Sequence, residues 1–302
     1  MRNPDVPALR LEEFTPKEIP GLVKLSASVG WDYDEDEVKT LFSAGKVFGH
    51  KDSQGLVCSS AAVIPYGKTL ASIGMVIVHR ECRGLGLGKE LTQACIDAVS
   101  GGKAFADDMD VANDPILMLI ATPEGRPLYE KMGFAAVDCV HKLLCDVYAA
   151  PKESPKDSAA SVQPLLPEHV EQVVKLDQRA VGAERKSFLQ RRIQQARKGV
   201  VLLDADGRVT GYGLAIEGPV NLILGPIVAP DDQGASRIVT ELARDCQGRL
   251  RIDVPSGHHA FRTFLQSCGF VQVSQPPVMI KNGERLPERN GQLFAIAAQV
   301  FG

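Results

Sequence analysis

Residues 70–100, LASIGMVIVHRECRGLGLGKELTQACIDAVS, decide the fold of the first half of the chain. An apolar run over 69–79 predicts a strand, and the amphipathic pattern that ends near Ser100 predicts a helix. The glycines of the turn between them are Gly84, Gly86 and Gly88, and the cations beside it are Arg80, Arg83 and Lys89. Glycine lets the backbone approach a ligand, and a helix N-terminus offers unpaired N–H groups. This turn is typical of a phosphate or pyrophosphate site.

Two other glycine-rich phosphate motifs are excluded by their spacing. A dinucleotide fingerprint, GxGxxG, needs a third glycine where Lys89 stands. A Walker A loop needs a glycine where Arg83 stands, and a serine or threonine where Glu90 stands. The strand, turn and helix therefore indicate an anion site of a different kind.

The composition limits the class of protein. A chain of 302 residues with 44% hydrophobic and 24% charged residues is typical of a globular protein of two domains. The formal charge of −3 gives no support for binding to nucleic acid or to a membrane surface. No apolar run has the ~20 residues that cross a bilayer, and the N-terminus does not resemble a signal peptide. Seven cysteines without a CxxC pair predict reduced thiols in a cytoplasmic protein, with neither a metal site nor a disulfide framework.

The remaining patterns of the first half predict the order β-α-α-β-β-β-α-β-α-β-β. Thr15 to Glu18 form a capping box that opens a helix to about Ser28. A second helix is predicted over 34–42, and a third over 126–132, which Gly133 closes. The predicted strands cover 8–13, 46–51, 55–64, 69–79 and 115–121, and a terminal hairpin covers 134–147. Residues 101–114 are predicted to form a surface loop.

Two stretches of this half resemble the GCN5-related N-acetyltransferase (GNAT) fold. Arg83-Gly84-Leu85-Gly86-Leu87-Gly88 matches the R/Q-x-x-G-x-G/A pyrophosphate loop that follows strand four of that family. LYEKMGF, residues 128–134, matches the LYExxGF signature of its fourth helix. The resemblance implies an α/β (α+β) fold, in which helices flank a mixed, mostly antiparallel twisted sheet that binds acetyl-CoA.

The second half repeats this pattern, which predicts two tandem GNAT folds. The predicted domains are 1–148, which binds acetyl-CoA and is catalytic, and 162–302, joined by a linker at 149–161. Segments 177–185 and 224–231 resemble the C-terminal domain of two-domain GNAT proteins of the YitH-like group.

A comparison of the halves without gaps indicates what the second one lacks. Gly74 pairs with Gly225 and Leu91 with Leu242, both at an offset of 151 residues. At this offset Gly86 falls on Arg237, and the glycine cradle is lost. Leu265 stands where the first half has its tyrosine. The second domain is therefore expected to have a degenerate CoA loop and to shape the acceptor site.

The resemblance also implies the CoA contacts. Backbone N–H groups of the turn would bind the pyrophosphate, and the exposed backbone of strand four would bind the pantetheine and the thioester oxygen. The residues so implied are Met75, Val76, Ile77, Val78, Arg83, Gly84, Leu85, Gly86, Leu87, Gly88 and Lys89. Tyr129 is the expected general acid, because a phenol is protonated at neutral pH and can protonate a leaving thiolate. A tyrosine that only packs beneath the CoA chain is the alternative.

Acceptor contacts are expected between the first two helices, at Trp31, Asp32 and Tyr33. The competing interpretations are a core tryptophan for Trp31 and helix capping for Asp34. Glu35 is a further carboxylate of this region. The general base is left open, and His79 is expected to be structural because it lies close to the pyrophosphate loop.

The expected activity is acetyl transfer from acetyl-CoA to the amine of a small molecule, by direct attack in a ternary complex. Two alternatives remain: a non-catalytic acyl-CoA-binding or sensing module, and an acetyltransferase that acts on protein amines. A longer acyl donor is also compatible with the sequence. No metal, nucleic acid or membrane partner is expected, and the oligomeric state is left open.

Overall fold

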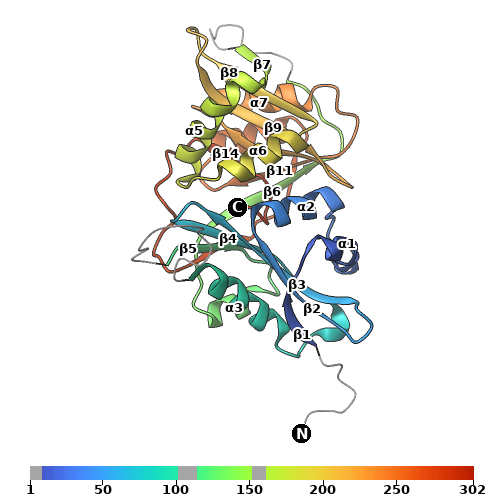
Figure 1. Ribbon diagram of the computed structural model, residues 1–302. Coiled ribbons are helices and arrows are strands. Elements are labelled where there is room, and N and C mark those ends of the chain that lie inside the picture. The colour runs from blue at the N-terminus through green and yellow to red at the C-terminus, as the bar shows by residue number, and fades with distance from the viewer. Residues whose placement is uncertain (1–8, 101–113, 152–160) are drawn as a thin grey trace.

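The computed structural model describes residues 9–100, 114–151 and 161–302, in which fourteen strands form one twisted sheet (Figure 1). The strands of the first half are β1 (Arg10–Glu13), β2 (Lys46–Lys51), β3 (Val57–Tyr66), β4 (Leu70–Val78), β5 (Ile116–Ile120) and β6 (Ala135–Cys145). Its α-helices are α1 (Ile19–Ser28), α2 (Glu35–Ala44), α3 (Leu87–Val99) and α4 (Arg126–Lys131). Helices flank this mixed, mostly antiparallel sheet, which confirms the predicted fold class.

The second half repeats the arrangement. Its strands are β7 (Ser161–Pro164), β8 (Lys198–Leu203), β9 (Val209–Glu217), β10 (Leu222–Val228), β11 (Leu250–Pro255), β12 (Val271–Ser274), β13 (Pro277–Lys281) and β14 (Leu293–Ala295). Its α-helices are α5 (Val170–Val181), α6 (Lys186–Gln195), α7 (Asp232–Ala243) and α8 (His259–Ser267). In each half one strand pair is parallel, β4 with β5 and β10 with β11.

The helix caps that the sequence predicts are present in the structure. The capping box of Thr15 and Glu18 is present, and Asp34 accepts a hydrogen bond from the N–H of Glu37 at 2.8 Å. Asp34 therefore caps α2, as its competing interpretation stated. The loop predicted over 101–114 and most of the predicted linker lie outside the described residues.

The hairpin predicted over 134–147 is wrong. These residues form one long strand, β6, which leaves the sheet of the first half and enters that of the second (Figure 1). Residues 135–139 of β6 pair with β13, and residues 140–145 pair with β11. A hairpin would need the chain to turn back within this stretch, but partners from the other half satisfy both ends of the straight strand.

The exchange of strands is reciprocal. β13, from the second half, lies between β5 and β6 in the first sheet, with buried side chains at Val278, Met279 and Ile280. In return, the later part of β6 lies between β11 and β12. Each half thus completes its sheet with a strand that the other half supplies.

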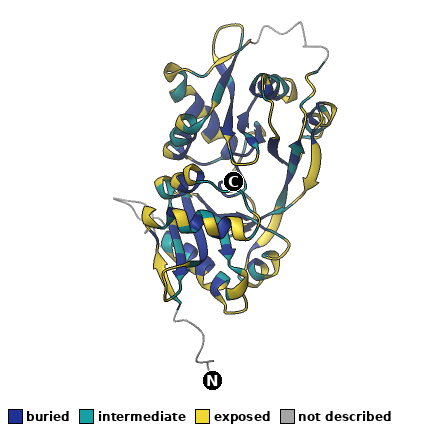
Figure 2. Cartoon of the chain, turned by 90° about the vertical axis from the view of Figure 1, so that its right-hand side faces the viewer, coloured by how far each residue is buried: buried dark blue, intermediate teal, exposed yellow. Residues whose placement is uncertain are grey.

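The hydrophobic core also crosses between the halves. One buried cluster joins Leu22 and Tyr66 of the first half to Phe188 and Phe301 of the second, and the Tyr66 and Phe188 rings lie 5.7 Å apart. Figure 2 shows buried residues along the strands and exposed residues on the outer helices. In the described parts of the chain no helix is long and apolar enough to cross a membrane.

Residues 296–302, which we call the central segment, run between the halves. A Cβ on Gly74 would lie 2.8 Å from the carbonyl oxygen of Val300, and one on Gly225 would clash with that of Ile296. The two glycines therefore occupy equivalent places, as the comparison of the halves predicted. Both permit the same segment to approach a strand.

The gapless correspondence fails after these strands. Residues 79–86 connect β4 to α3, but only residues 229–231 connect β10 to α7. Leu91 consequently lies near the start of its helix, whereas Leu242 lies near the end. The second half has a shorter loop rather than a substituted one, so Arg237 is not the counterpart of Gly86.

Candidate functional site

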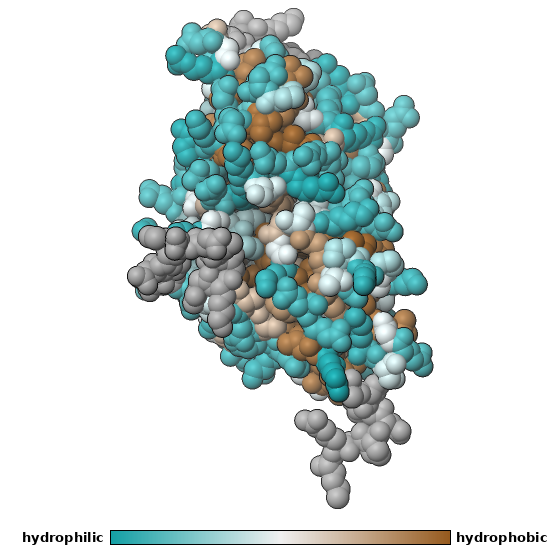
Figure 3. All heavy atoms as spheres, viewed as in Figure 1, coloured by the Kyte–Doolittle hydropathy of each residue, from teal (hydrophilic) through white to brown (hydrophobic). Residues whose placement is uncertain are grey.

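A cavity of about 780 Å³ opens between the two halves. Figure 3 shows apolar and weakly polar residues at the surface between the halves, framed by hydrophilic ones. The sequence-predicted residues that line it are Trp31, Asp32, Tyr33, Met75, Val76, Ile77, Val78, Arg83, Gly88 and Tyr129. Tertiary folding therefore brings the residues predicted to bind CoA and those predicted to contact the acceptor to the same cavity.

Strand β4 presents free backbone to this cavity. Its parallel pairing with β5 ends at Ser72 and Met118, and the two strands then separate. The family resemblance implies exposed backbone on this strand, and the separation leaves β4 without a described strand partner on this side after Ser72. Opposite β3, the register shifts so that Met75 and Val76 form a bulge. Met75 has a φ of 52°, which is uncommon for a residue other than glycine, and its carbonyl accepts a hydrogen bond from Ser60 Oγ at 2.9 Å.

The glycine turn leads from β4 to the first turn of α3. Gly84 and Gly86 both have a φ of 82°, a left-handed conformation that favours glycine. Among the described residues, no hydrogen bond pairs the backbone N–H groups from Gly84 to Gly88. Because no side chain caps α3, these N–H groups and the partial charge of the helix remain available to an anion.

Some predicted loop residues lie at the rim of the cavity rather than on its wall. Gly84, Leu85, Gly86, Leu87 and Lys89 are absent from its lining, although the loop that they form leads into it. Leu85 and Lys89 are exposed, and Leu87 packs inward.

Tyr129, on α4, lies at the same end of the cavity as the turn. It is 6% exposed, and its ring packs against Phe134 at a centroid distance of 6.0 Å. Burial raises the pKa of Tyr129 to about 12. The hydroxyl is therefore protonated at neutral pH. It makes no hydrogen bond to any described residue, which leaves its proton available to a ligand.

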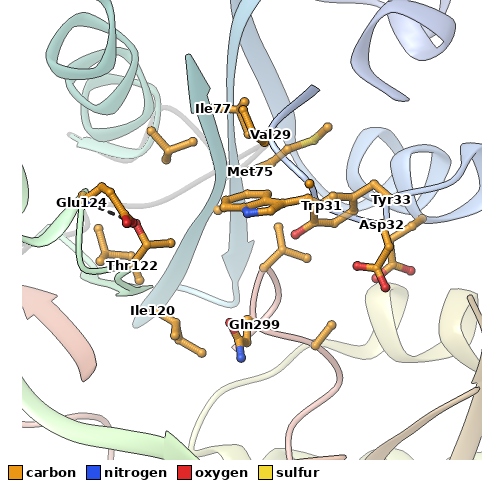
Figure 4. Close-up of a pocket in the computed structure, with 18 of the residues that line it drawn as sticks. Val29, Trp31, Asp32, Tyr33, Met75, Ile77, Ile120, Thr122, Glu124 and Gln299 are labelled. Atoms are coloured by element: carbon orange, nitrogen blue, oxygen red, sulfur yellow. Dashed lines mark hydrogen bonds between the residues drawn. The ribbon is translucent and has the colours of Figure 1, made fainter. Parts of the chain in front are cut away.

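The opposite end of the cavity holds the predicted acceptor residues. In Figure 4, Trp31 lies between the Thr122 and Glu124 side and the Asp32 and Tyr33 side. The Trp31 and Tyr33 rings are 6.1 Å apart, and burial raises the pKa of Tyr33. Asn221 Nδ2, from the second half, donates to Asp32 Oδ2 at 3.4 Å.

The sequence did not predict the residues that the second half and β6 contribute. Lys142 and Arg251 line the acceptor end, and Gln299 of the central segment lies on the side opposite Met75 (Figure 4). Arg251 Nε and Gln299 Nε2 both donate to the carboxylate of Asp253 at 2.8 Å. No local pattern marks these residues, because they line the cavity only through contacts between the two halves.

Two other residues that the sequence analysis considered, His79 and Glu35, do not line the cavity. The Nδ1 of His79 is 4.0 Å from Glu81. Glu35 is exposed and pairs with Lys39 at 3.5 Å. Among the residues that the structure describes, no group of three or more His, Cys, Asp or Glu could hold a metal ion.

The corresponding cleft of the second half is filled by the chain itself. β10 and β11 separate after Leu224 and Ile252, and β14 occupies the gap by pairing with β10. At the N-terminus of α7, Asp231 Oδ1 accepts a hydrogen bond from the N–H of Gly234 at 2.7 Å. A carboxylate thus takes the position at the helix end that remains open in the first half.

Comparisons with known proteins agree with this architecture. Two family models described as acetyltransferase (GNAT) domains match residues 44–136 and 173–295. The uncharacterized N-acetyltransferase YitH of Bacillus subtilis (strain 168) is 33% identical over 287 residues, which cover 95% of this chain and 96% of YitH.

Solved structures show the same fold over nearly the whole length of the chain. A putative acetyltransferase from Pyrococcus horikoshii has a TM-score of 0.74 at 17% identity, covering 100% of this chain and 99% of its own. A tandem GNAT protein from the clavulanic acid biosynthesis pathway has a TM-score of 0.64 at 14% identity, covering 92% and 99%.

Proposed function

Because this chain belongs to the GNAT family of acetyltransferases, we propose that its first half binds acetyl-CoA and transfers the acetyl group to the amine of a small molecule. The observation that carries the proposal is the cavity that joins the free backbone of β4, the uncapped end of α3 and the buried Tyr129. A cavity between two halves suits a small ligand better than a protein chain.

In this proposal CoA lies in the gap between β4 and β5. The N–H groups of the glycine turn bind the pyrophosphate, helped by Arg83, which also donates from Nε to the carbonyl of Val78 at 3.3 Å. Gly88 keeps the helix start close to α4, because a Cβ there would lie 3.3 Å from Leu128. The bulge at Met75 and Val76 leaves backbone groups available to the thioester carbonyl.

The chemistry is direct attack in a ternary complex. The amine nitrogen attacks the thioester carbon, its proton passes to a carboxylate, and the carbon–sulfur bond breaks. Tyr129 then donates its proton to the CoA thiolate. Among the carboxylates at the acceptor end, Asp32 is the proposed base. Asp34 caps α2, Glu37 is paired with Arg192 in a buried ion pair, and Glu217 is paired with Arg197.

Replacement of Tyr129 by phenylalanine tests the general acid. Because general acids contribute roughly 10²–10⁴-fold to rate, we expect kcat of Tyr129→Phe to fall about 100-fold, with acetyl-CoA affinity unchanged. Release of CoA thiol gives the rate, and calorimetry gives the affinity. Tyr148→Phe is the matched control, since burial also raises the pKa of Tyr148 to about 12 but this residue lies outside the cavity. If Tyr129→Phe and the unmodified protein release thiol at equal rates, Tyr129 is not the general acid and only packs in the protein.

The filled cleft of the second half predicts how many acetyl-CoA molecules bind to each chain. Because β14 and Asp231 occupy the positions of pantetheine and pyrophosphate there, calorimetry is expected to find one acetyl-CoA per chain. A stoichiometry of two would contradict the restriction of the activity to the first half.

A further inference from the structure

Three of the charged side chains that line the cavity are neutralised by an ion-pair partner. Glu37 pairs with Arg192, and Glu217 Oε2 lies 2.9 Å from Arg197. Arg251 makes an ion pair of 2.8 Å with Asp253. Arg80, Arg83 and Glu124 lie at the end of the cavity that holds the glycine turn and α4.

At the acceptor end, this leaves one cation, Lys142, and two carboxylates, Asp32 and Asp34, and the carboxylate of Asp34 caps α2. Lys142 forms no hydrogen bond or ion pair with any described residue, and Asp32 has only the amide of Asn221. The two side chains come from different elements, β6 and the turn before α2. Each charge influences the other electrostatically, yet no ion pair within 4 Å joins them.

The surroundings of Lys142 favour an anionic ligand. The side chain is only partly exposed, and its burial and the neighbouring Arg251 both lower the pKa of Lys142. Asp253 cannot compensate fully, since Arg251 and Gln299 already use its two oxygens. A bound carboxylate would replace lost hydration and supply the missing counter-charge.

We infer that the acceptor carries a carboxylate near its amine, and that Lys142 binds this carboxylate while Asp32 faces the amine. The inference rests on the acetyl transfer proposed above and names the substrate class of the same cavity. A zwitterionic amino acid would satisfy both unpaired charges at once. Lys142 is thus a specificity-determining residue, and the exchanged part of β6 places it at the cavity between the halves.

The test offers the protein matched pairs of amines with saturating acetyl-CoA. The probes are glycine, L-phenylalanine, L-lysine and L-glutamate, each with its α-carboxamide, together with spermidine and glucosamine as amines without a carboxylate. Release of CoA thiol reports the reaction. Because the amine of an amide is less basic and more often neutral, chemistry alone favours the amide. We expect at least one amino acid to exceed its amide about 10- to 100-fold in kcat/KM.

Variants of Lys142 test whether its positive charge causes the preference for an amino acid over its amide. Lys142→Met is expected to raise KM for the preferred amino acid about 10- to 100-fold and to leave the amide within about 3-fold. Lys142→Arg should restore most of the preference, because it keeps the charge but cannot act as a base at neutral pH. Lys175→Met, on the exposed face of α5, is the control.

The outcomes separate this inference from the proposed function. If spermidine, glucosamine or the amides release thiol as well as the amino acids do, acetyl transfer stands and the carboxylate inference is overturned. The inference is also overturned if Lys142→Met lowers kcat equally for acid and amide and Lys142→Arg does not rescue it, since Lys142 would then be a base. Absence of thiol release with every amine counts against acetyl transfer itself.

Discussion

Produced separately, residues 1–148 and 162–302 are expected not to fold, whereas the two pieces produced together are expected to form one particle. Without β13, the first half loses three buried side chains and both of its neighbouring strand pairings. At about 1.5–3 kcal/mol for each buried apolar side chain, the loss is roughly 5–9 kcal/mol. This is comparable to the whole stability of a domain, about 5–15 kcal/mol.

The second half loses as much when β6 is absent. Val140, Leu143 and Cys145 of β6 are buried, and six residues of β11 pair with this strand. Circular dichroism and gel filtration of each piece, alone and mixed, measure the effect. A matched control is the full chain with a protease site placed at 155, cut after folding, whose pieces should stay associated until denaturant is added. Two well-folded monomeric pieces would contradict the exchange.

Gly86→Asp is expected to weaken acetyl-CoA binding by at least about 100-fold, because each charge-assisted hydrogen bond contributes roughly 1.5–3 kcal/mol. Gly86 is the N-cap of α3, and Asp231 is the N-cap of α7. The substitution therefore reproduces in the first half the carboxylate that occupies the helix end of the second. It would repel the pyrophosphate and cap the N–H groups that bind it.

The variant should fold, which makes the measurement specific to the ligand. A Cβ at Gly86 meets no atom within 4 Å, and aspartate tolerates left-handed backbone better than most residues. Gly55→Asp is the control, since Gly55 has a φ of 83°, is equally open and lies in the turn between β2 and β3. Calorimetry with acetyl-CoA gives the affinity of each. Unchanged affinity in Gly86→Asp would show that the pyrophosphate binds elsewhere.

The sequence alone determined the features that depend on short stretches. The order of strands and helices in the first half, apart from the hairpin, followed from hydrophobic periodicity and from caps such as Thr15 and Asp34. The glycine turn was also found this way, because a tight turn before a helix is local, whereas Tyr129 was singled out by the family signature around it. Which of these residues contact acetyl-CoA stays a prediction that the experiments above address.

Only the tertiary structure decided how the halves combine. Periodicity shows that a segment is a strand, but the identity of its partner depends on contacts between residues far apart in the chain. The single strand β6 was therefore predicted as a hairpin, and the insertion of β13 was not predicted at all. Lys142 and Arg251 were not predicted for the same reason: they lie on β6 and β11, which pair with each other across the two halves.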